Sequence, residues 1–587
     1  MRSSRVHHRP LRLALAVLLL CVTVNGQQRG AAPRAAQHYE KGVALLERQQ
    51  LDAAINELTL ATRLSPKSAD AHNALGIALA RKGDIKAAAA AFRKAVALDP
   101  TLYEAQLGLG ASLQQSGDVD GALAAFKQAA SLKPVEAEAR LMLGAALQQK
   151  GDIDGALAEF RVAVRLKPDA PAAHSYLGYA LGAKGSLQES IAEFETAVRL
   201  KPDFAEAQYY LGAARWLAGD VKGTIAALTT AAGLMPSHAN AHYYLGLALR
   251  KNGDLTAAIE ELGKAVRLSP EMVEARHALG QALQQDENLD GAIEAFREVV
   301  RLKPDFVQAR NDLGLALVQK RDPAGAIAEF NAALKLEPGN QVALHNLGMA
   351  LIQKGDFAAA VTQYRKLLAL APDDAEAHYN LALALKQRDA LDEAVAELKR
   401  ATALRPGLQE AHYTLGVILL QQSKLDDAAA SFKAAVGAKR DYAEAHYALG
   451  TVLQQQGKLD EAIATYREAL RHAPNAPEIH NTLGTTLSRK GDREAARAEF
   501  QEAARLNKIK SNMQAAMFAT NTGIARLNEG NLDAAIERFR AAIQLDPTSA
   551  QAFYNLAKAL RQKGQSDAAR TAYQKAKELD PRLKPLQ

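Results

Sequence analysis

Residues 442–475 read YAEAHYALGTVLQQQGKLDEAIATYREALRHAPN, and close variants of this 34-residue phrase fill almost the whole 587-residue chain. Prolines mark the period, because they recur every 34 residues from Pro66 to Pro406 and return at Pro474. With this proline at position 32 of each unit, sixteen repeats run from Ala35 to Leu583, and five extra residues precede the last two. A fixed period of this length indicates one structural unit stacked many times.

Each repeat carries two segments whose apolar residues recur with helical spacing. In the repeat that begins at Ala443, Ala445 and Leu449 lie on one face of a first helix, and Tyr466 lies on the apolar face of a second. Gly457 between them suits a helix C-cap, and Asp460 suits the first turn of the next helix. The repeat therefore predicts a pair of helices joined by a short turn.

Position 8 of the repeat is glycine in fourteen of the sixteen units, Gly450 among them. A glycine inside a helix costs about 1 kcal/mol relative to alanine, so its recurrence predicts a packing reason. We expect close approach of the second helix through its small position-20 residue, Ala462 in this repeat. A leucine in place of Gly450 would then overpack the pair.

The phrase resembles the tetratricopeptide repeat. Leu449-Gly450, Ala462, Tyr466, Ala469 and Pro474 occupy the places of that family's leucine-glycine, alanine, aromatic, alanine and proline signature. The resemblance covers about residues 35–583. It implies an all-α fold, a right-handed superhelical solenoid of about sixteen helix-turn-helix repeats, whose concave inner surface binds peptides or proteins.

The stretch LQQQGKLDEAI at 453–463 is also similar to the repeats of O-linked N-acetylglucosamine transferase. That family carries an asparagine ladder at position 6, which this chain keeps only at Asn346, Asn380, Asn521 and Asn555. The repeats leave no residues for the catalytic domain of the transferase. We therefore expect no glycosyltransferase activity from this chain.

The N-terminus predicts a secretory signal. Arginines precede an apolar run of twelve residues at 13–24, which suits a signal core and is short for a membrane span. We expect cleavage after Gly26, with an uncleaved anchor as the alternative. The predicted organisation is a signal at 1–26, a linker at 27–34, repeats at 35–510, an insertion at 511–515, repeats at 516–583 and a tail at 584–587.

Composition argues against several kinds of function. The net charge is +7, but four arginines fall within the first twelve residues. The rest of the chain therefore lacks the clustered positive charge that is typical of a nucleic-acid binder. Cys21, the only cysteine, would leave with the signal, and the mature chain would hold no disulfide or thiolate site. We expect no nucleic acid, no cofactor and no stable membrane span after cleavage, and a periplasmic or extracellular protein.

Histidines and glutamates recur in rows that could suggest chemistry. His378, His412, His446 and His480 stand at position 4 of successive repeats, but stacked helices about 8–10 Å apart cannot readily share one ion. We interpret them as half-buried interface residues and predict no metal site. The position-2 glutamates, such as Glu376, are interpreted as acids that favour a helix N-terminus. No catalytic residue is predicted.

The first helix presents a second face, at positions 2, 5, 9, 12 and 13, which the family resemblance places in the groove. In three successive repeats this face combines tyrosine and glutamine, and in two of them it also holds an aliphatic residue. Such a face could stack on, bury and hydrogen-bond an extended peptide. Passive copying of an ancestral repeat explains the same pattern equally well. The candidate residues are Tyr379, Leu383, Gln387, Tyr413, Val417, Gln421, Tyr447 and Gln455.

A second candidate is an aromatic cluster in residues 176–244. Its groove positions hold Tyr179, Tyr209, Trp216 and Tyr243, and the same repeats replace the position-20 alanine by Ser190 and Thr224. The cluster predicts a stacking platform for a peptide or a sugar chain. The alternative is that the rings fill space between neighbouring helices.

Residues 507–523, NKIKSNMQAAMFATNTG, interrupt the repeat. We expect an extension of the first helix of repeat fifteen, a bend, or a contact surface near the C-terminal end. The sequence as a whole predicts a non-catalytic protein-interaction scaffold. A carbohydrate-binding or polysaccharide-export module is the alternative, and self-association through the end repeats stays open.

Overall fold

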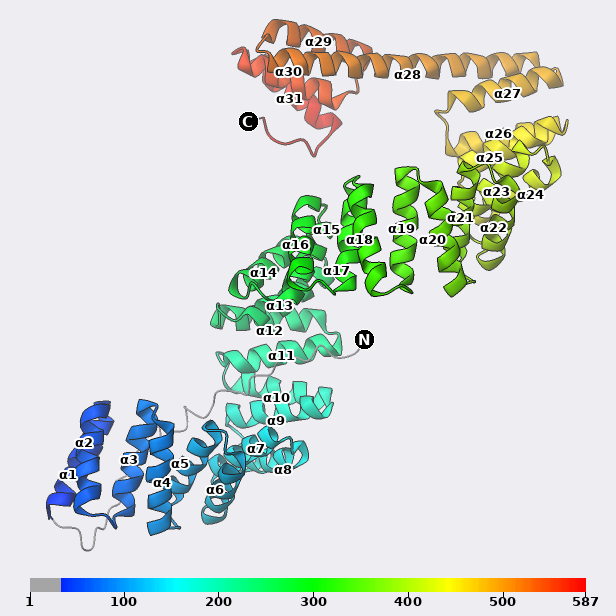
Figure 1. Cartoon of the computed structure of the whole chain (residues 1–587). Helices are drawn as coiled ribbons and strands as arrows, with labels where there is room; N and C mark the ends of the chain where they lie inside the picture. The colour runs from blue at the N-terminus through cyan, green and yellow to red at the C-terminus, as the bar shows by residue number, and fades with distance from the viewer. Residues whose placement is uncertain (1–32, 587) are drawn as a thin grey trace. The chain divides into compact units, whose positions relative to one another are not determined.

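The computed structural model describes residues 33–586, and these residues form thirty-one α-helices and no strand (Figure 1). The chain divides into two compact units, the first ending at Ala316 and the second starting at Leu317. The predicted signal at 1–26 lies outside the described residues. Helix α1 begins at Pro33, so the last two residues of the predicted linker are helical.

The helices of the first unit correspond to the first and second helices of repeats one to eight, followed by the first helix of repeat nine, which crosses the boundary. They are α1 Pro33–Glu47, α2 Leu51–Leu64, α3 Ala69–Lys82, α4 Ile85–Leu98, α5 Tyr103–Gln115, α6 Val119–Leu132, α7 Ala137–Lys150, α8 Ile153–Leu166, α9 Pro171–Lys184, α10 Leu187–Leu200, α11 Ala205–Ala218, α12 Val221–Leu234, α13 Ala239–Asn252, α14 Leu255–Leu268, α15 Val273–Gln285, α16 Leu289–Leu302 and α17 Val307–Gln319.

The helices of the second unit continue the same alternation as far as repeat fourteen. They are α18 Pro323–Leu336, α19 Gln341–Lys354, α20 Phe357–Leu370, α21 Ala375–Gln387, α22 Leu391–Leu404, α23 Gln409–Gln421, α24 Leu425–Ala438, α25 Ala443–Gln455, α26 Leu459–His472, α27 Pro477–Lys490, α28 Arg493–Asn528, α29 Leu532–Leu545, α30 Ala550–Gln562 and α31 Ser566–Leu579.

Within each unit, helices that follow one another in the chain pack against each other. In addition, the first helices of neighbouring repeats touch, as α3 does α5 and α23 does α25. Each helix thus buries one stripe against its repeat mate and another against the next repeat. This is the all-helical solenoid of helix-turn-helix repeats that the sequence predicts.

The turn inside each repeat is built from local chain chemistry. Gly457 ends the first helix with φ +79° in the left-handed region, as predicted for a C-cap. Many second helices then begin at an aspartate whose carboxylate caps the free amides of the first turn. In repeat three, Asp118 Oδ1 accepts from the backbone N–H of Gly121 at 2.9 Å.

The position-8 glycine does mark a close approach, but its partner differs from the predicted one. A Cβ built on Gly450 would lie 2.6 Å from Cε1 of Tyr466, the position-24 ring of the second helix. The expected neighbour, Ala462, is buried in the same interface but is not the nearest atom. The glycine therefore makes room for a large side chain, because the fully buried ring must reach across to the first helix.

The alternation fails once, between repeats fourteen and fifteen. Sixteen helix pairs would give thirty-two helices, but the second helix of repeat fourteen and the first helix of repeat fifteen form one continuous helix, α28. Figure 1 shows α28 running from α27 to α29. The predicted insertion at 511–515 is therefore helical, and no turn separates these two repeats. No helix within residues 33–586 is both long and apolar enough to cross a membrane.

Candidate binding surface

The predicted tyrosines at position 5 are half-buried between helices. Tyr413 packs on Phe432 with ring centroids 5.7 Å apart, and Tyr447 packs on Tyr466 at 5.8 Å. The Tyr447 hydroxyl also lies 3.2 Å from Thr482 Oγ1 in the next repeat. Each ring therefore has one side fixed by the second helix of its own repeat, which orients the remaining exposed edge.

Burial also changes the acidity of these rings. Desolvation raises the pKa of Tyr413, with a smaller contribution from the Glu444 carboxylate. It raises the pKa of Tyr379 as well, although a hydrogen bond with Thr414 acts in the opposite direction. Both tyrosines are thus neutral hydroxyl groups over the physiological pH range, able to donate one hydrogen bond and accept another.

The other members of the predicted stripe lie further along the same helices. Leu383 and Val417 are half-buried, whereas Gln387, Gln421 and Gln455 are exposed at or near the C-terminal ends of α21, α23 and α25. The structure therefore arranges a half-buried tyrosine and aliphatic surface with an exposed row of amides beside it. Such a surface can bury an apolar side chain and pair with a peptide backbone.

The aromatic cluster of repeats five to seven forms, but it is mainly a packing element. Tyr209 is only 8% exposed and lies among Tyr210, His238 and Tyr244, with ring centroids 5.2, 4.7 and 6.5 Å away. Desolvation raises the pKa of Tyr209. The prediction that Tyr209 offers a stacking face is wrong, because neighbouring helices already cover its ring.

Tyr179, Tyr243 and Trp216 keep partial exposure. The ring of Tyr179 meets Tyr210 edge-on at 5.2 Å, and Tyr243 lies 5.1 Å from Tyr244. Desolvation raises the pKa of Tyr243 to about 12. Lys251 Nζ lies 5.4 Å from the centroid of the Trp216 ring, so a cation already occupies one face of the indole.

The position-20 replacements in these repeats are explained by packing rather than by a ligand. Ser190 Oγ donates to the backbone carbonyl of Gly178 at 2.7 Å, and Thr224 Oγ1 donates to that of Asp220 at the same distance. Both side chains are fully buried. Each hydroxyl is satisfied by a local backbone oxygen, so neither is available to a bound molecule.

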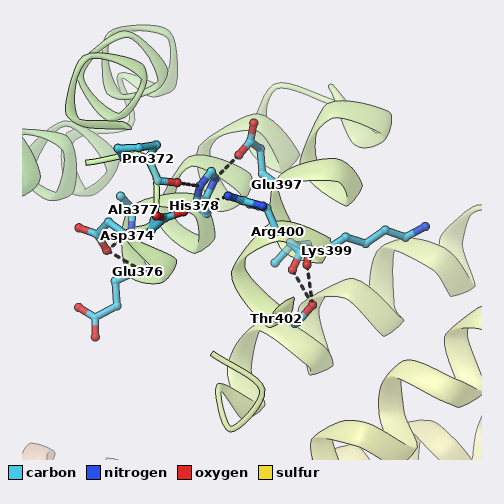
Figure 2. A network of polar contacts seen from close by, with 11 residues as sticks. Pro372, Asp374, Glu376, Ala377, His378, Glu397, Lys399, Arg400 and Thr402 are labelled. Carbon is cyan, nitrogen blue, oxygen red and sulfur yellow. Dashed lines mark hydrogen bonds and ion pairs between the residues drawn. The ribbon is translucent and has the colours of Figure 1, made fainter. Parts of the chain in front are cut away.

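The position-4 histidines link successive repeats, as the sequence predicts. His378 Nδ1 lies 2.5 Å from Glu397 Oε2, and its Nε2 lies 3.0 Å from the carbonyl oxygen of Pro372 in the preceding repeat (Figure 2). The same pair of contacts recurs at His174, His242 and His480. We name this arrangement the histidine clamp. A carboxylate and a carbonyl only accept hydrogen bonds, so each of these two contacts needs a ring N–H as its donor.

His412 and His446 make only the carbonyl contact, at 3.0 and 2.9 Å. The difference follows from position 23, which is glutamate in the clamped repeats.

 In these two repeats position 23 is Ser431 and Thr465, respectively, and neither side chain replaces the carboxylate. The clamp therefore needs both its histidine and its glutamate.

The position-2 glutamates behave as acids on a helix N-terminal turn. Glu376 Oε1 accepts from Arg405 Nη1 at 2.6 Å, and Glu104 accepts from Lys133 at 3.1 Å. Glu138 differs, because burial and then the nearby Glu136 carboxylate raise its pKa to about 7. Within residues 33–586, no group of three histidine, cysteine, aspartate or glutamate side chains could hold a metal ion.

One polar network on the first helices was missed by the sequence reasoning. Asp312, which is buried, accepts from Gln281 at 3.0 Å and from Gln308 at 2.9 Å, and its Oδ2 lies 2.8 Å from His277 Nε2. Arg250 Nη1 in turn donates to Gln281 Oε1 at 2.5 Å. An aspartate at position 6 was the available signal, since asparagine or small residues are common there. The members of the network come from repeats seven, eight and nine, so it joins these three repeats.

Comparison with known families gives one consistent result. Models described as tetratricopeptide repeat match residues 39–102, 107–171, 277–341, 413–477 and 520–583, and two further ones match 375–407 and 453–517. A model described as TPR repeat matches 180–219, 246–287 and 348–389. No curated protein matches the chain. The narrower resemblance to O-linked N-acetylglucosamine transferase repeats stays a prediction.

Several solved structures are similar to parts of the chain. YrrB, described as a TPR protein with an unusual peptide-binding site, is 23% identical over 32% of this chain and 96% of its own, with a TM-score of 0.31. MamA from Desulfovibrio magneticus RS-1 is 23% identical over 30% and 98%, with a TM-score of 0.28. The C-terminal part of a TPR repeat-containing protein from Cytophaga hutchinsonii is 17% identical over 40% and 98%, with a TM-score of 0.35.

Proposed function

This chain belongs to the tetratricopeptide repeat family, and we propose that it is a non-catalytic scaffold that binds an extended segment of a partner protein. The binding surface is the stripe of Tyr379, Tyr413 and Tyr447 with the exposed amides of Gln387, Gln421 and Gln455. The observation that carries the proposal is the exposed row of glutamines beside half-buried tyrosines in three successive repeats.

The spacing of the stripe suits an extended peptide. Packed helices lie about 8–10 Å apart, and an extended chain rises about 3.3 Å per residue. One repeat of the stripe therefore corresponds to about three peptide residues. Each glutamine amide can donate to a backbone carbonyl and accept from a backbone N–H, and each tyrosine edge can cover an apolar side chain.

Several groups that could perform acid–base chemistry are engaged in contacts within the fold. The histidine of each clamp uses both ring nitrogens in contacts within the protein, as at His378. The position-2 glutamates Glu376 and Glu104 pair with Arg405 and Lys133, which directly follow the second helix of the same repeat. This engagement supports a binding role.

A carbohydrate-binding role is the alternative, and it depends on aromatic faces that are open to a sugar ring. Tyr209 has no such face, and Lys251 lies over one face of Trp216. We therefore favour a peptide over a glycan as the ligand. We further propose that the chain is exported and acts in the cell envelope or outside the cell. Sequencing the N-terminus of the mature protein tests this, because cleavage as proposed gives a chain that starts at Gln27.

The ligand is tested by affinity capture with the immobilised chain from the source's extracytoplasmic extract. Untreated, protease-treated and glycan-degraded extracts are run in parallel. A peptide ligand predicts that capture is lost only after protease treatment. Loss only after glycan degradation would overturn the peptide proposal and support the carbohydrate alternative.

The surface is tested with a triple variant, Gln387→Ala, Gln421→Ala and Gln455→Ala. Its matched control changes three exposed glutamines on second helices, Gln128, Gln188 and Gln544, to alanine. We expect at least a tenfold loss of captured material for the first variant and none for the control. Equal capture by both variants would place the ligand elsewhere.

A further inference from the structure

Helix α28 leaves two repeats unstacked. In repeats one to thirteen and in repeat fifteen, the position-24 side chain is at most 3% exposed, whereas Phe500 at this position in repeat fourteen is 39% exposed. Position 6 shows that repeat fifteen is also uncovered where it would face repeat fourteen. Asn521 of repeat fifteen is exposed, although position 6 is buried or half-buried in repeats two to fourteen and in repeat sixteen.

The charges at the junction between repeats fourteen and fifteen disfavour stacking of these two repeats. At five other junctions a lysine at position 14 pairs with an aspartate at position 18 of the preceding repeat, as Lys150 does with Asp120 at 2.7 Å and Lys184 with Asp154 at 2.6 Å. Between repeats fourteen and fifteen these positions hold Glu494 and Glu529. Stacking would bring two like charges together, so the extended form of α28 is favoured.

The extended helix exposes an apolar stripe at its middle. Ile509, Met513 and Met517 follow one another at four-residue spacing and are 42, 51 and 62% exposed. Leu506 and Thr520 lie on the same side, within about 80° at 100° per residue. Both of these are buried, Leu506 at the α27 end of the helix and Thr520 at the α29 end.

The stripe is therefore continuous, covered at both ends and uncovered over about 12 Å in between, at 1.5 Å per residue. We propose that the middle of α28 binds the same segment of a second copy of this chain. The two helices run antiparallel and cross near Met513, with a two-fold axis between the two Met513 side chains. Ile509 of one copy then packs against Met517 of the other.

The pattern of the segment favours a second copy over an unrelated helix. It is symmetric about Met513, because Leu506 mirrors Thr520 and Ile509 mirrors Met517. Lys508 and Phe518, which is 74% exposed, each lie about 140° from the centre of the stripe and point away from the second copy, so the contact consists of the apolar side chains alone.

The crossing geometry agrees with the length of the stripe. Ridges formed by residues four apart interdigitate when two helices cross at about −50°, and such helices diverge after about two turns. Divergence leaves room for α27 on one side and α29 on the other. The buried area is small for a dimer, so we expect association that is concentration-dependent, with a Kd near 100 μM, on the order expected for a small contact.

Cysteine cross-linking of the full chain tests both the contact and its direction. In a Cys21→Ser background the chain has no other cysteine. Met513→Cys should form a disulfide dimer under mild oxidation, because a two-fold axis brings the two Cα atoms within bonding range. Ile509→Cys and Met517→Cys should each cross-link poorly alone and efficiently when mixed. Leu217→Cys, at a side chain on α11 that is 76% exposed, is the control for cross-linking by random collision.

Sedimentation equilibrium gives an independent measurement without any cross-link. The wild-type chain should dimerise as its concentration rises, and Met513→Glu should shift the midpoint at least tenfold higher. Leu217→Glu should leave it unchanged. A chain that stays monomeric well above the expected Kd, a dimer unaffected by Met513→Glu, or cross-linking no faster than at Leu217→Cys would each overturn the proposal.

Discussion

A single missing Cβ decides how closely the two helices of a repeat approach. Gly450 faces the Tyr466 ring so closely that an added Cβ would lie 2.6 Å from Cε1, and the ring is fully buried and cannot retreat. We predict that Gly450→Ala lowers the free energy of unfolding by about 1–3 kcal/mol through overpacking. Hydrogen exchange of α25 and α26 measures the loss locally.

Gly437 supplies the matched control, because it also lies in a helix, α24, but has no atom within 4 Å of a built Cβ. Gly437→Ala should raise stability by about 0.5–1 kcal/mol, since alanine favours a helix more than glycine does. A change of the same sign in both variants would show that helix propensity, not the Tyr466 contact, governs position 8.

The histidine clamp should contribute to the junction between repeats. His378→Leu leaves Glu397 and the Pro372 carbonyl without their donor, so we expect a loss of about 1–3 kcal/mol. His412→Leu removes only a carbonyl contact at an exposed site and should cost less. Faster exchange in α20 and α21 for His378→Leu, relative to the equivalent helices in His412→Leu, is the expected result. Equal effects would assign no role to the carboxylate.

Single residues are also where the sequence was least informative. The interface position of His378 follows from repeat spacing, but its partner Glu397 stands 19 residues away on another helix. The Tyr209 ring likewise meets partners from α11 and the segment that begins α13. A pattern along one helix separates its faces but does not show which of them a neighbouring repeat covers.

At the level of the helix pair, the turn between the two helices has one strained position. Position 15 adopts a left-handed backbone in every repeat, and eleven repeats use glycine there, whereas Ser423 holds φ +60°. A non-glycine residue in this region costs about 1–2 kcal/mol. Ser423→Gly should therefore raise the free energy of unfolding by about 0.5–1 kcal/mol, less than the strain because glycine also gains freedom in the unfolded chain.

Urea unfolding of Ser423→Gly measures the effect, with the reverse change Gly457→Ser as the matched comparison in the next repeat. Gly457 has φ +79°, so the serine should lower stability by a similar amount. A destabilising Ser423→Gly would mean that the serine makes a contact worth more than its backbone strain.

The elements themselves were predictable, because caps, apolar period and turn agree in each repeat. Gly457 and Asp460 mark the turn of repeat thirteen where α25 ends and α26 begins. The segment 507–523 was the exception. Its five inserted residues have helical propensity and include neither proline nor glycine, so they extend α28 rather than interrupt it. The sequence left this outcome open, because the loss of the proline fits both a longer helix and a bend.

At the scale of the whole chain, the sequence contains two solenoid ends. Positions 17 and 21 are apolar in repeats one to thirteen and in repeat fifteen, as at Leu459 and Ile463. Repeat fourteen instead holds Arg493 and Arg497, and repeat sixteen holds polar residues at the same two positions. A terminal repeat needs a polar outer face, because no further repeat covers it. Repeat fourteen is therefore built as the end of one array.

This predicts opposite outcomes for two truncations. A chain that ends at Lys510 keeps the polar outer face of repeat fourteen and loses only repeats that do not stack on it. A chain that ends at Ala476 uncovers Tyr466 and Ile463, which are buried in the complete protein. Exposing them removes apolar burial worth about 1.5–3 kcal/mol for each large side chain. Hydrogen exchange in α25 and α26 should therefore be unchanged in the first chain and much faster in the second, which should also aggregate. Equal loss of protection in both chains would show that repeats fifteen and sixteen stabilise the preceding array, against the charge and burial pattern at this junction.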